Sequence, residues 1–168
     1  MKVHYFIVWM GLFSVMLLSG CASSKQTAKE EKVEKEAKLL EAIENRTFIV
    51  EVDRALPTNG SSRILTSPYS LTINGDAVKS HLPFFGRAYS VPYGGGDGLM
   101  FDSTLTDYQF TFDKKGMAII DFKTRTKEDQ FTYRVQIFKN GSSSIHVTSN
   151  NRQPISFTGQ CNPITPNL

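Results

Sequence analysis

Side chains able to act as nucleophiles or metal ligands are few in this sequence and lie far apart. Beyond the N-terminal region the histidines are His81 and His146, and a cysteine, Cys161, stands near the C-terminus. No HExxH motif, paired Cys/His spacing, aspartate-rich calcium loop or GxSxG turn accompanies them. Cys161 lies in a tail rich in proline and asparagine, with no neighbouring base to activate its thiol. We therefore expect no catalytic residue, no metal and no cofactor; a metal held by the two histidines is the weaker alternative to solvent-facing or hydrogen-bonded strand histidines.

The most unusual stretch runs from Leu82 to Gly98, LPFFGRAYSVPYGGGDG. It combines four aromatic residues, five glycines and one arginine without any period. A loop of this length inside a domain is typically functional or disordered, and disordered segments are poor in aromatics. We expect an ordered loop that closes one end of the domain, with Phe84 and Phe85 inserted and with Tyr89 and Tyr93 partly exposed.

Arg87 stands among these aromatics and is a candidate contact for an anionic ligand or a partner. A guanidinium stacks on aromatic rings and binds carboxylates through paired hydrogen bonds. The alternative, which we favour, is a structural arginine that pairs with Asp97 or Asp102 and fixes the loop. His81, beside the loop, and Arg152, in the segment SNNRQP, are further candidate contacts. The aromatic residues of the loop are also candidates: Phe84, Phe85, Tyr89 and Tyr93.

The glycine run from Gly94 to Gly98 suggests a phosphate-binding loop. Such a loop needs a helix N-terminus behind it to present N–H groups to the phosphate. The residues that follow, Leu99-Met100-Phe101, are typical of a strand instead. We therefore expect these glycines to reverse the chain direction rather than to bind a nucleotide.

The N-terminus carries a separate chemical signal. Lys2 precedes an apolar run from Tyr5 to Leu18, which is too short for an ordinary membrane-spanning helix. Leu18-Ser19-Gly20-Cys21 then matches the bacterial lipobox, in which small residues precede the cysteine. We expect residues 1–20 to be a lipoprotein signal peptide and Cys21 to receive lipid, palmitate among its acyl chains; a plain signal peptide or a spanning helix is the alternative.

The charge balance argues against nucleic acid as a partner. The chain has 19 lysines and arginines against 16 acidic residues, and Lys2 would leave with the signal. Nucleic-acid-binding domains usually present a strongly basic face. If Cys21 carries lipid, Cys161 lacks a partner for a disulfide within the chain.

Residues 21–46 predict a polar tether followed by a helix over 27–44. Thr27 and Glu30 fit a capping box at its start. An apolar stripe at helical spacing is expected to place the last turns on the domain, so that the helix acts as a spacer; a coiled coil or partner helix is the alternative. The stripe consists of Val33, Ala37, Leu40 and, at its last position, Ile43 or Glu44.

Residues 47–168 predict one β-rich domain. Apolar and polar residues alternate over about nine short segments separated by turn signals, and Asn74-Gly75 is the clearest hairpin turn. Leu99–Ser103 is expected as a short strand of its own, separate from the one through Tyr108 and Phe112. The fold class is therefore mainly β, an antiparallel meander closed as a barrel or stacked as a sandwich, with one N-terminal α-helix.

Several of these segments together resemble a known family. The lipobox, LPFFGRAY, the glycine run before LMF, the NG turn and the terminal SNNRQPISFTG resemble domain-of-unknown-function family 4251 of Bacteroides-like bacteria, over about residues 40–160. The resemblance implies an envelope lipoprotein with a β-rich fold and brings no activity with it. Residues 22–26 lack the acidic residues that often follow the lipidated cysteine of surface-exposed lipoproteins in such bacteria, which favours an outer-membrane anchor facing the periplasm.

We therefore expect a non-catalytic lipoprotein of the cell envelope with a binding or structural role, in which Leu82 to Gly98 is the recognition or closure element. The membrane, through the lipid anchor, is the expected partner, and a small molecule or a protein is a further one. The alternatives are an enzyme with its active site beside that loop, and a module that binds or inhibits a protein partner.

Overall fold

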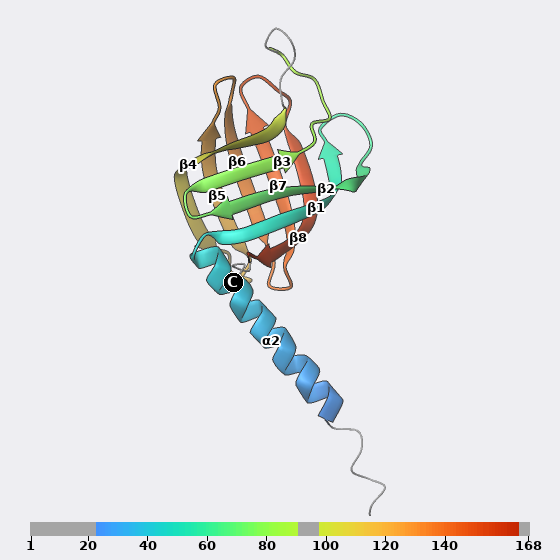
Figure 1. The fold of residues 1–168 in the computed structure, drawn as a ribbon. Helices are drawn as coiled ribbons and strands as arrows, with labels where there is room; N and C mark the ends of the chain where they lie inside the picture. Colours follow the sequence, from blue (N-terminus) through green and yellow to red (C-terminus); the bar gives the residue numbers. More distant parts are fainter. Residues whose placement is uncertain (1–22, 91–97, 165–168) are drawn as a thin grey trace, which may run out of the picture. The chain divides into compact units, whose positions relative to one another are not determined.

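The structure is a computed structural model that describes residues 23–90 and 98–164, with side chains from residue 30 onward in these ranges. The expected signal peptide, the lipidation of Cys21, the exposure of Tyr93 and the role of the glycine run lie outside or partly outside the described residues. The described chain forms one helix and eight strands (Figure 1): α2 (Ser23–Glu44), β1 (Thr47–Pro57), β2 (Arg63–Asn74), β3 (Ala77–Leu82), β4 (Leu99–Phe112), β5 (Ala118–Arg125), β6 (Gln130–Ile137), β7 (Ser142–Ser149) and β8 (Ile155–Pro163).

The strands form a closed antiparallel barrel in chain order, so the barrel alternative is correct and the sandwich alternative is wrong. Each strand pairs with the next, and β1 pairs with β8 to complete the circle. The predicted hairpin turn joins β2 to β3, and Gly75 there has a φ of 60°, a conformation that costs glycine little. Closure gives the first and last strands a partner on both sides.

The prediction of nine strands was wrong because β4 is one long strand. It includes both the predicted short strand Leu99–Ser103 and the predicted strand through Tyr108 and Phe112. A bulge between Thr106 and Gln109, with Asp107 at a φ of 52°, interrupts the pairing of β4 with β5. A bulge shifts the alternation of inward and outward side chains, which is why the two halves have the sequence pattern of separate strands.

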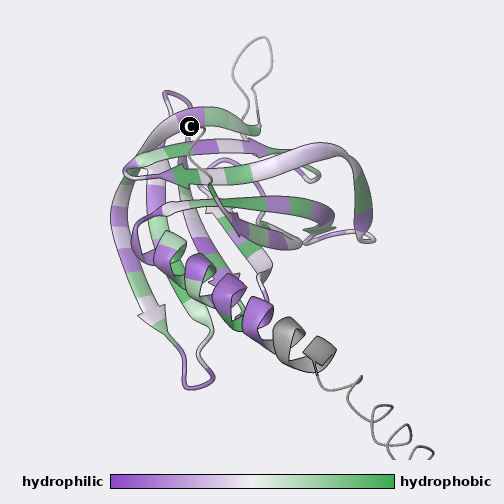
Figure 2. Ribbon diagram, turned by 60° about the horizontal axis from the view of Figure 1, so that its bottom comes forward, coloured by the Kyte–Doolittle hydropathy of each residue, from purple (hydrophilic) through white to green (hydrophobic). Residues whose placement is uncertain are grey.

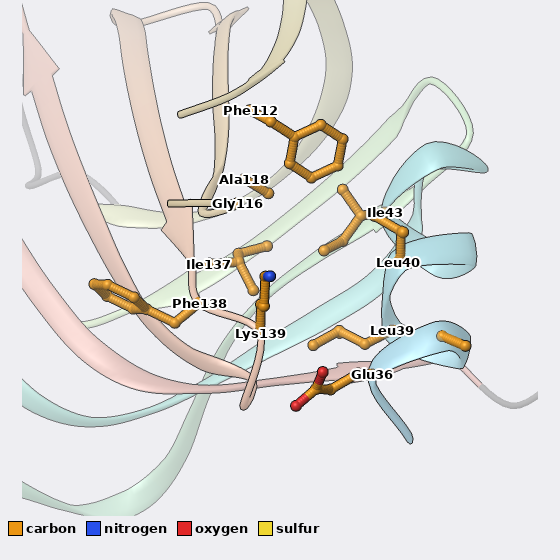
Figure 3. Close-up of a pocket in the computed structure, with 11 residues that line it drawn as sticks. Glu36, Leu39, Leu40, Ile43, Phe112, Gly116, Ala118, Ile137, Phe138 and Lys139 are labelled. Atoms are coloured by element: carbon orange, nitrogen blue, oxygen red, sulfur yellow. The ribbon is translucent and has the colours of Figure 1, made fainter. Parts of the chain in front are cut away.

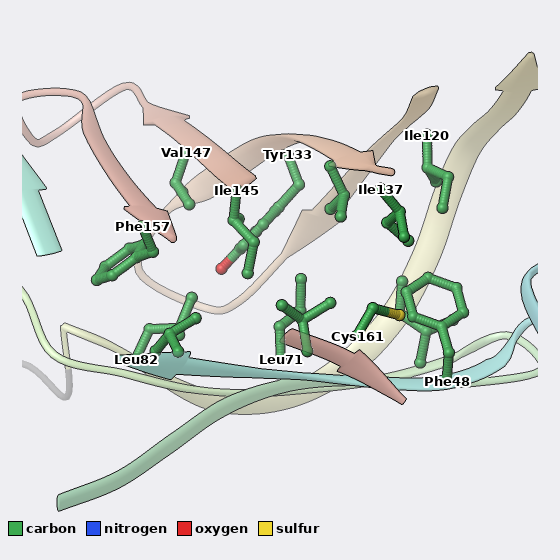
Figure 4. Close-up of a cluster of buried hydrophobic side chains, with 14 of the residues drawn as sticks. Phe48, Leu71, Leu82, Ile120, Tyr133, Ile137, Ile145, Val147, Phe157 and Cys161 are labelled. Carbon is green, nitrogen blue, oxygen red and sulfur yellow. The ribbon is translucent and has the colours of Figure 1, made fainter. Parts of the chain in front are cut away.

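The barrel interior is filled with apolar side chains from all eight strands (Figure 4). Hydrophobic and hydrophilic residues alternate along the strand ribbons, as a wall with one buried face requires (Figure 2). Aromatic rings stack in it, with the Phe122 and Tyr133 centroids 4.9 Å apart. The hydroxyl of Tyr133 lies 3.1 Å from Ser80 Oγ, and Ser80 Oγ donates to the carbonyl of Leu99 at 2.6 Å. Eight-stranded barrels are just wide enough for side chains or one small ligand. Side chains take that space here, so a binding site must lie at an end of the barrel or on its outside.

The helix differs from prediction at its start and on its buried face. It begins at Ser23, so Thr27 lies inside it and the predicted capping box does not start the helix. Its last turns bury Leu39, Ala42 and Ile43, whereas two residues of the predicted stripe, Val33 and Leu40, are exposed. The packing of the last turns on the barrel is confirmed; the buried face is rotated by about one residue because Leu39 and Leu40 are adjacent and equally apolar.

Cys161 lies within β8, not in an irregular tail as predicted. It is opposite Val50 of β1, is buried, and forms no disulfide within the described residues. The last strand therefore continues past Phe157 to Pro163 and carries the pairing that closes the barrel. None of the described helical residues forms a stretch long and apolar enough to cross a bilayer.

Candidate binding site at the barrel rim

Three loops meet at the barrel end where β3 finishes and β4 starts. Main-chain bonds link the loop after β3 to the loop between β7 and β8: Tyr89 N–H donates to the Asn151 carbonyl at 2.7 Å, and Gln153 N–H donates to the Arg87 carbonyl at 3.0 Å. The amide of Asn151 donates at 3.0 Å to the carbonyl of Glu128, in the turn between β5 and β6. The predicted recognition loop, in its described part up to residue 90, is therefore bonded to the β7–β8 loop, which is bonded in turn to the β5–β6 turn.

A buried pair of opposite charges lies between these loops. The Nε atom of Arg152 is 3.9 Å from Oδ2 of Asp129, and the two side chains are 8% and 2% exposed. This distance is too long for a hydrogen bond. Within the described residues, neither Arg152 Nε nor Asp129 Oδ2 has a hydrogen-bond partner. The other carboxylate oxygen, Oδ1, accepts the N–H of Gln130 at 2.8 Å. The pair thus leaves one donor and one acceptor free, side by side, in a buried position.

Each member of the pair is held by its own loop. Thr126 Oγ1 accepts the N–H of Asp129 at 3.1 Å, and Thr126 N–H donates to the Asp129 carbonyl at 2.9 Å, which closes a tight turn. Arg152 pairs with Ala88 in an isolated β-bridge, and its guanidinium lies over the ring of Phe84, 5.5 Å from the centroid. The geometry of the two charges is therefore set by backbone pairing.

The pair lines a pocket of about 560 Å³, here named the rim pocket. The rings of Phe101 and Phe131, stacked with centroids 4.8 Å apart, also line it. Its charged residues are three acidic and three basic, so its lining is neutral overall. A volume of this size suits a small ligand or a short segment of a larger one. The rim pocket is lined by Gly98, Met100, Phe101, Asp102, Arg125, Thr126, Lys127, Glu128, Asp129, Phe131 and Arg152.

The structure reverses the ranking of the two candidate arginines. Arg87 is exposed, and within the described residues its side chain has no ion pair, so the predicted pairing with Asp102 is absent; Asp97 is not among the described residues. Arg87 fixes the loop through its backbone instead, since its N–H donates to Gln153 Oε1 at 3.0 Å. Arg152, the weaker candidate from sequence, is the buried arginine of the rim pocket.

The aromatic residues of the loop behave partly as predicted. Phe84 and Phe85 pack against the core but stay half-buried rather than fully inserted. Phe84 lies beneath Arg152, and Phe85 lies beneath Arg63, whose guanidinium is 4.7 Å from the ring centroid. Tyr89 is 64% exposed, which confirms the prediction that its side chain is at least partly exposed to solvent.

The histidines and the cysteine do not form a reactive cluster. His81 stacks on Tyr69 at 5.5 Å, and His146 Nδ1 lies 2.8 Å from Ser156 Oγ, so both are surface strand residues. Burial raises the pKa of the Cys161 thiol to about 12 and keeps it protonated at neutral pH. Among the described residues no three His, Cys, Asp or Glu side chains are grouped to hold a metal ion.

Asp129 is the functional candidate that sequence reasoning missed. It belongs to the turn Arg125–Gln130, which the sequence marks only as polar. The T-x-x-D spacing of Thr126 and Asp129 was a usable signal, because a threonine hydroxyl can accept a backbone N–H and close such a turn. The meeting of this turn with Arg152 follows from the pairing of β6 with β7, which sets Phe131 opposite Ser149, and no signal within the turn itself reports it.

A second hollow lies at the opposite end of the barrel (Figure 3). It has a volume of about 400 Å³ and is lined by the last turns of α2 and by barrel residues at the β4–β5 and β6–β7 turns. Figure 3 shows Leu39 and Ile43 facing Ile137 and Ala118 across it. Glu36 and Lys139 are its charged lining residues, so it suits an apolar group and offers little specificity.

Fold and site together define a small antiparallel barrel whose filled interior leaves a polar, charge-balanced pocket at one rim. The chain belongs to the family described as Domain of unknown function (DUF4251), whose model matches residues 30–161. It is similar in fold to the crystal structure of a DUF4251 family protein from Bacteroides eggerthii DSM 20697, with a TM-score of 0.62 and 19% identity over 77% of this chain and 87% of that chain. A comparison with curated proteins found no match.

Proposed function

We propose that this chain is a non-catalytic binding lipoprotein of the cell envelope and that the rim pocket is its binding site. One observation carries the proposal: Arg152 Nε and Asp129 Oδ2 are buried, border the same pocket and have no hydrogen-bond partner in the part of the chain that the structure describes. Leaving buried polar groups unpaired destabilises a protein, and such groups are expected chiefly where function requires them. A bound ligand with a donor and an acceptor side by side would satisfy both atoms.

The loop from Leu82 to Gly98 contributes to this site by holding Arg152 in place. Phe84 supports the guanidinium from below, and Ala88 pairs with its backbone. Tyr89 and Arg87 are exposed beside this junction and are available to contact a ligand or partner. Loops held on a rigid barrel are common positions for recognition residues.

The proposed location rests on two sequence features. The lipobox ending at Cys21 would supply a lipid anchor, and the lack of acidic residues over 22–26 favours the outer membrane with the domain facing the periplasm. Several acyl chains give a stable anchor where a single chain does not. Expression of Cys21→Ala in a bacterial host, followed by separation of membrane and soluble envelope fractions, tests the anchor. Full retention of the variant in the membrane would contradict it.

The binding role is tested by thermal unfolding of the lipid-free chain with three probe sets: short peptides, neutral oligosaccharides and small carboxylic acids. A ligand at 100 times its Kd stabilises the folded state by about 2.7 kcal/mol. The double variant Arg152→Met/Asp129→Asn should lose that stabilisation. A matched control, Arg134→Met/Asp121→Asn, changes an exposed pair on the outer face and should keep it. If no probe set stabilises the wild type, or if both double variants respond alike, the rim pocket is not the site.

A further inference from the structure

Strand β4 changes partners halfway along its length. Residues Ala77–Leu82 of β3 pair with β4 from Thr104 back to Leu99. The pairing of β4 with β5 begins only at Leu105, opposite Thr124. Within the described part of the chain, the stretch Leu99–Ser103 therefore has a strand on one side and none on the other.

The direction of the free main-chain groups follows from one hydrogen bond. The N–H of Leu105 donates to the carbonyl of Asp76 at 2.8 Å, on the β3 side of β4. In an antiparallel ladder, a residue directs its N–H and C=O to the same side, and successive residues alternate. Residues 99, 101 and 103 therefore direct their N–H and C=O groups toward β3. Met100 and Asp102 direct theirs to the opposite side, where β4 has no paired strand.

The rim pocket runs along this free edge. Met100, Phe101 and Asp102 form one wall, and the β5–β6 turn forms the other. Phe101 points inward, because it lies opposite the buried Ser80, and stacks on Phe131. The unpaired atoms of Arg152 and Asp129 border the same space. The pocket thus lies where a further strand could pair with Leu99–Ser103 of β4.

We propose that the rim pocket binds an extended peptide, which adds to β4 as a strand and bonds to the main chain of Met100 and Asp102. This inference rests on the proposed binding function and names its ligand class. Adding a strand to a free sheet edge is a recurrent mode of peptide recognition, in which main-chain bonds give affinity and pockets give specificity. A peptide group or polar side chain would supply the donor and acceptor that Asp129 Oδ2 and Arg152 Nε lack.

The spacing of the free groups favours a peptide over a saccharide. Met100 and Asp102 repeat the same donor and acceptor two residues apart, which matches the period of an extended chain. The balanced charge of the lining favours a peptide without strong net charge. Another free edge exists where β2 runs beyond its first β3 pair at Ser70, but Pro68 there has no N–H to donate.

The test starts from a random heptapeptide display library panned against the full chain without its signal. A selected peptide is then titrated against two variants by fluorescence polarisation. Asp102→Pro removes the N–H that points to the free side and leaves the β3 ladder intact, as proline on an edge allows. Asp102→Ala removes the same side chain but keeps the N–H, and should bind about tenfold more tightly than Asp102→Pro, the effect of one main-chain hydrogen bond.

N-methylation of the peptide gives an independent readout if Asp102→Pro does not fold. Strand addition predicts that methyl groups on alternate residues abolish binding and that those between them have little effect. Failure to select any peptide, equal binding by the two Asp102 variants, or a methylation pattern without alternation would overturn the inference. If oligosaccharides stabilise the wild type and not Arg152→Met/Asp129→Asn, while no peptide binds, the proposed function stands and the peptide inference fails.

Discussion

At the scale of single residues, the Arg152–Asp129 pair is unfavourable for stability, because two charges are buried without a hydrogen bond between them. A buried pair separated by 3.9 Å gains less than a hydrogen-bonded one and still requires both charges to leave water. Removing one partner leaves an uncompensated buried charge. The stability of the pair therefore depends strongly on whether one or both members are replaced.

We expect Arg152→Met alone to reduce the free energy of unfolding by about 3 kcal/mol, because it leaves Asp129 buried and charged. The double variant Arg152→Met/Asp129→Asn should recover most of that loss, since the asparagine carbonyl can still accept the Gln130 N–H. Urea unfolding of the single and double variants measures the coupling between them. A double variant as unstable as the sum of both single changes would contradict this account.

Cys161 gives a second prediction at this scale. Its thiol is buried, and burial raises its pKa to about 12, so the reactive thiolate is scarce at pH 8. We expect the native protein to resist iodoacetamide at pH 8 and to react at once in urea. The protonated thiol contributes stability that is fully present below the unfolded pKa of about 8.5 and is lost as the pH rises toward 12. Rapid labelling of the native chain would show that β8 separates readily from its neighbouring strands.

The residue scale is also where the sequence was least informative. It gave correct surface positions to His81, His146 and Tyr89, because alternation or a loop position determines them locally. The sequence ranked Arg87 above Arg152 as a candidate ligand contact. Neighbouring aromatic residues can be read from the sequence, whereas the burial of Arg152 where three loops meet cannot. Asp129 needs the same long-range information.

At the scale of elements, the alternation of apolar and polar residues was sufficient to predict the positions of most strands. Turn signals fixed the β2–β3, β5–β6 and β6–β7 connections, since each contains residues typical of tight turns. The continuity of β4 could not be seen, because its bulge at Thr106–Gln109 breaks the pattern that defines a strand. This long, bulged strand is the element that creates the free edge of the rim pocket.

The last turns of α2 provide a prediction for an element. Ile43 is buried against the barrel, whereas Leu40, three residues earlier, is 40% exposed. Ile43→Ala should reduce the free energy of unfolding by about 2–4 kcal/mol, and Leu40→Ala by under about 1 kcal/mol. Thermal or urea unfolding of the two variants checks this difference. Equal losses would mean that Leu40 also packs on the barrel, as the predicted stripe requires.

At the scale of the whole molecule, closure of the barrel is the property that the sequence did not determine. A barrel and a sandwich share alternating strands and tight turns, and they differ in whether the first strand pairs with the last. That pairing joins β1 to β8 across nearly the whole domain, with Phe48 opposite Pro163 and Pro57 opposite Ile155. No local signal reports such a contact, because its two strands lie at opposite ends of the domain sequence.

Gly159 is the position at which closure can be tested. It lies opposite Val52, next to the bulge of β1, and a Cβ added there would collide with the backbone of Glu51 and Val52. Because backbone cannot move aside as a flexible side chain can, Gly159→Ala should reduce the free energy of unfolding by about 3 kcal/mol or more. Gly75→Asn is the matched control: it lies in an open turn, and asparagine tolerates its φ of 60°, so its cost should stay near 0.5 kcal/mol.

Hydrogen exchange of the Gly159→Ala variant gives a second measurement of closure. Amide exchange should become faster first in β1 and β8, because the strain separates those strands. If Gly159→Ala is as stable as Gly75→Asn, the close approach of β1 and β8 is not what holds the barrel shut.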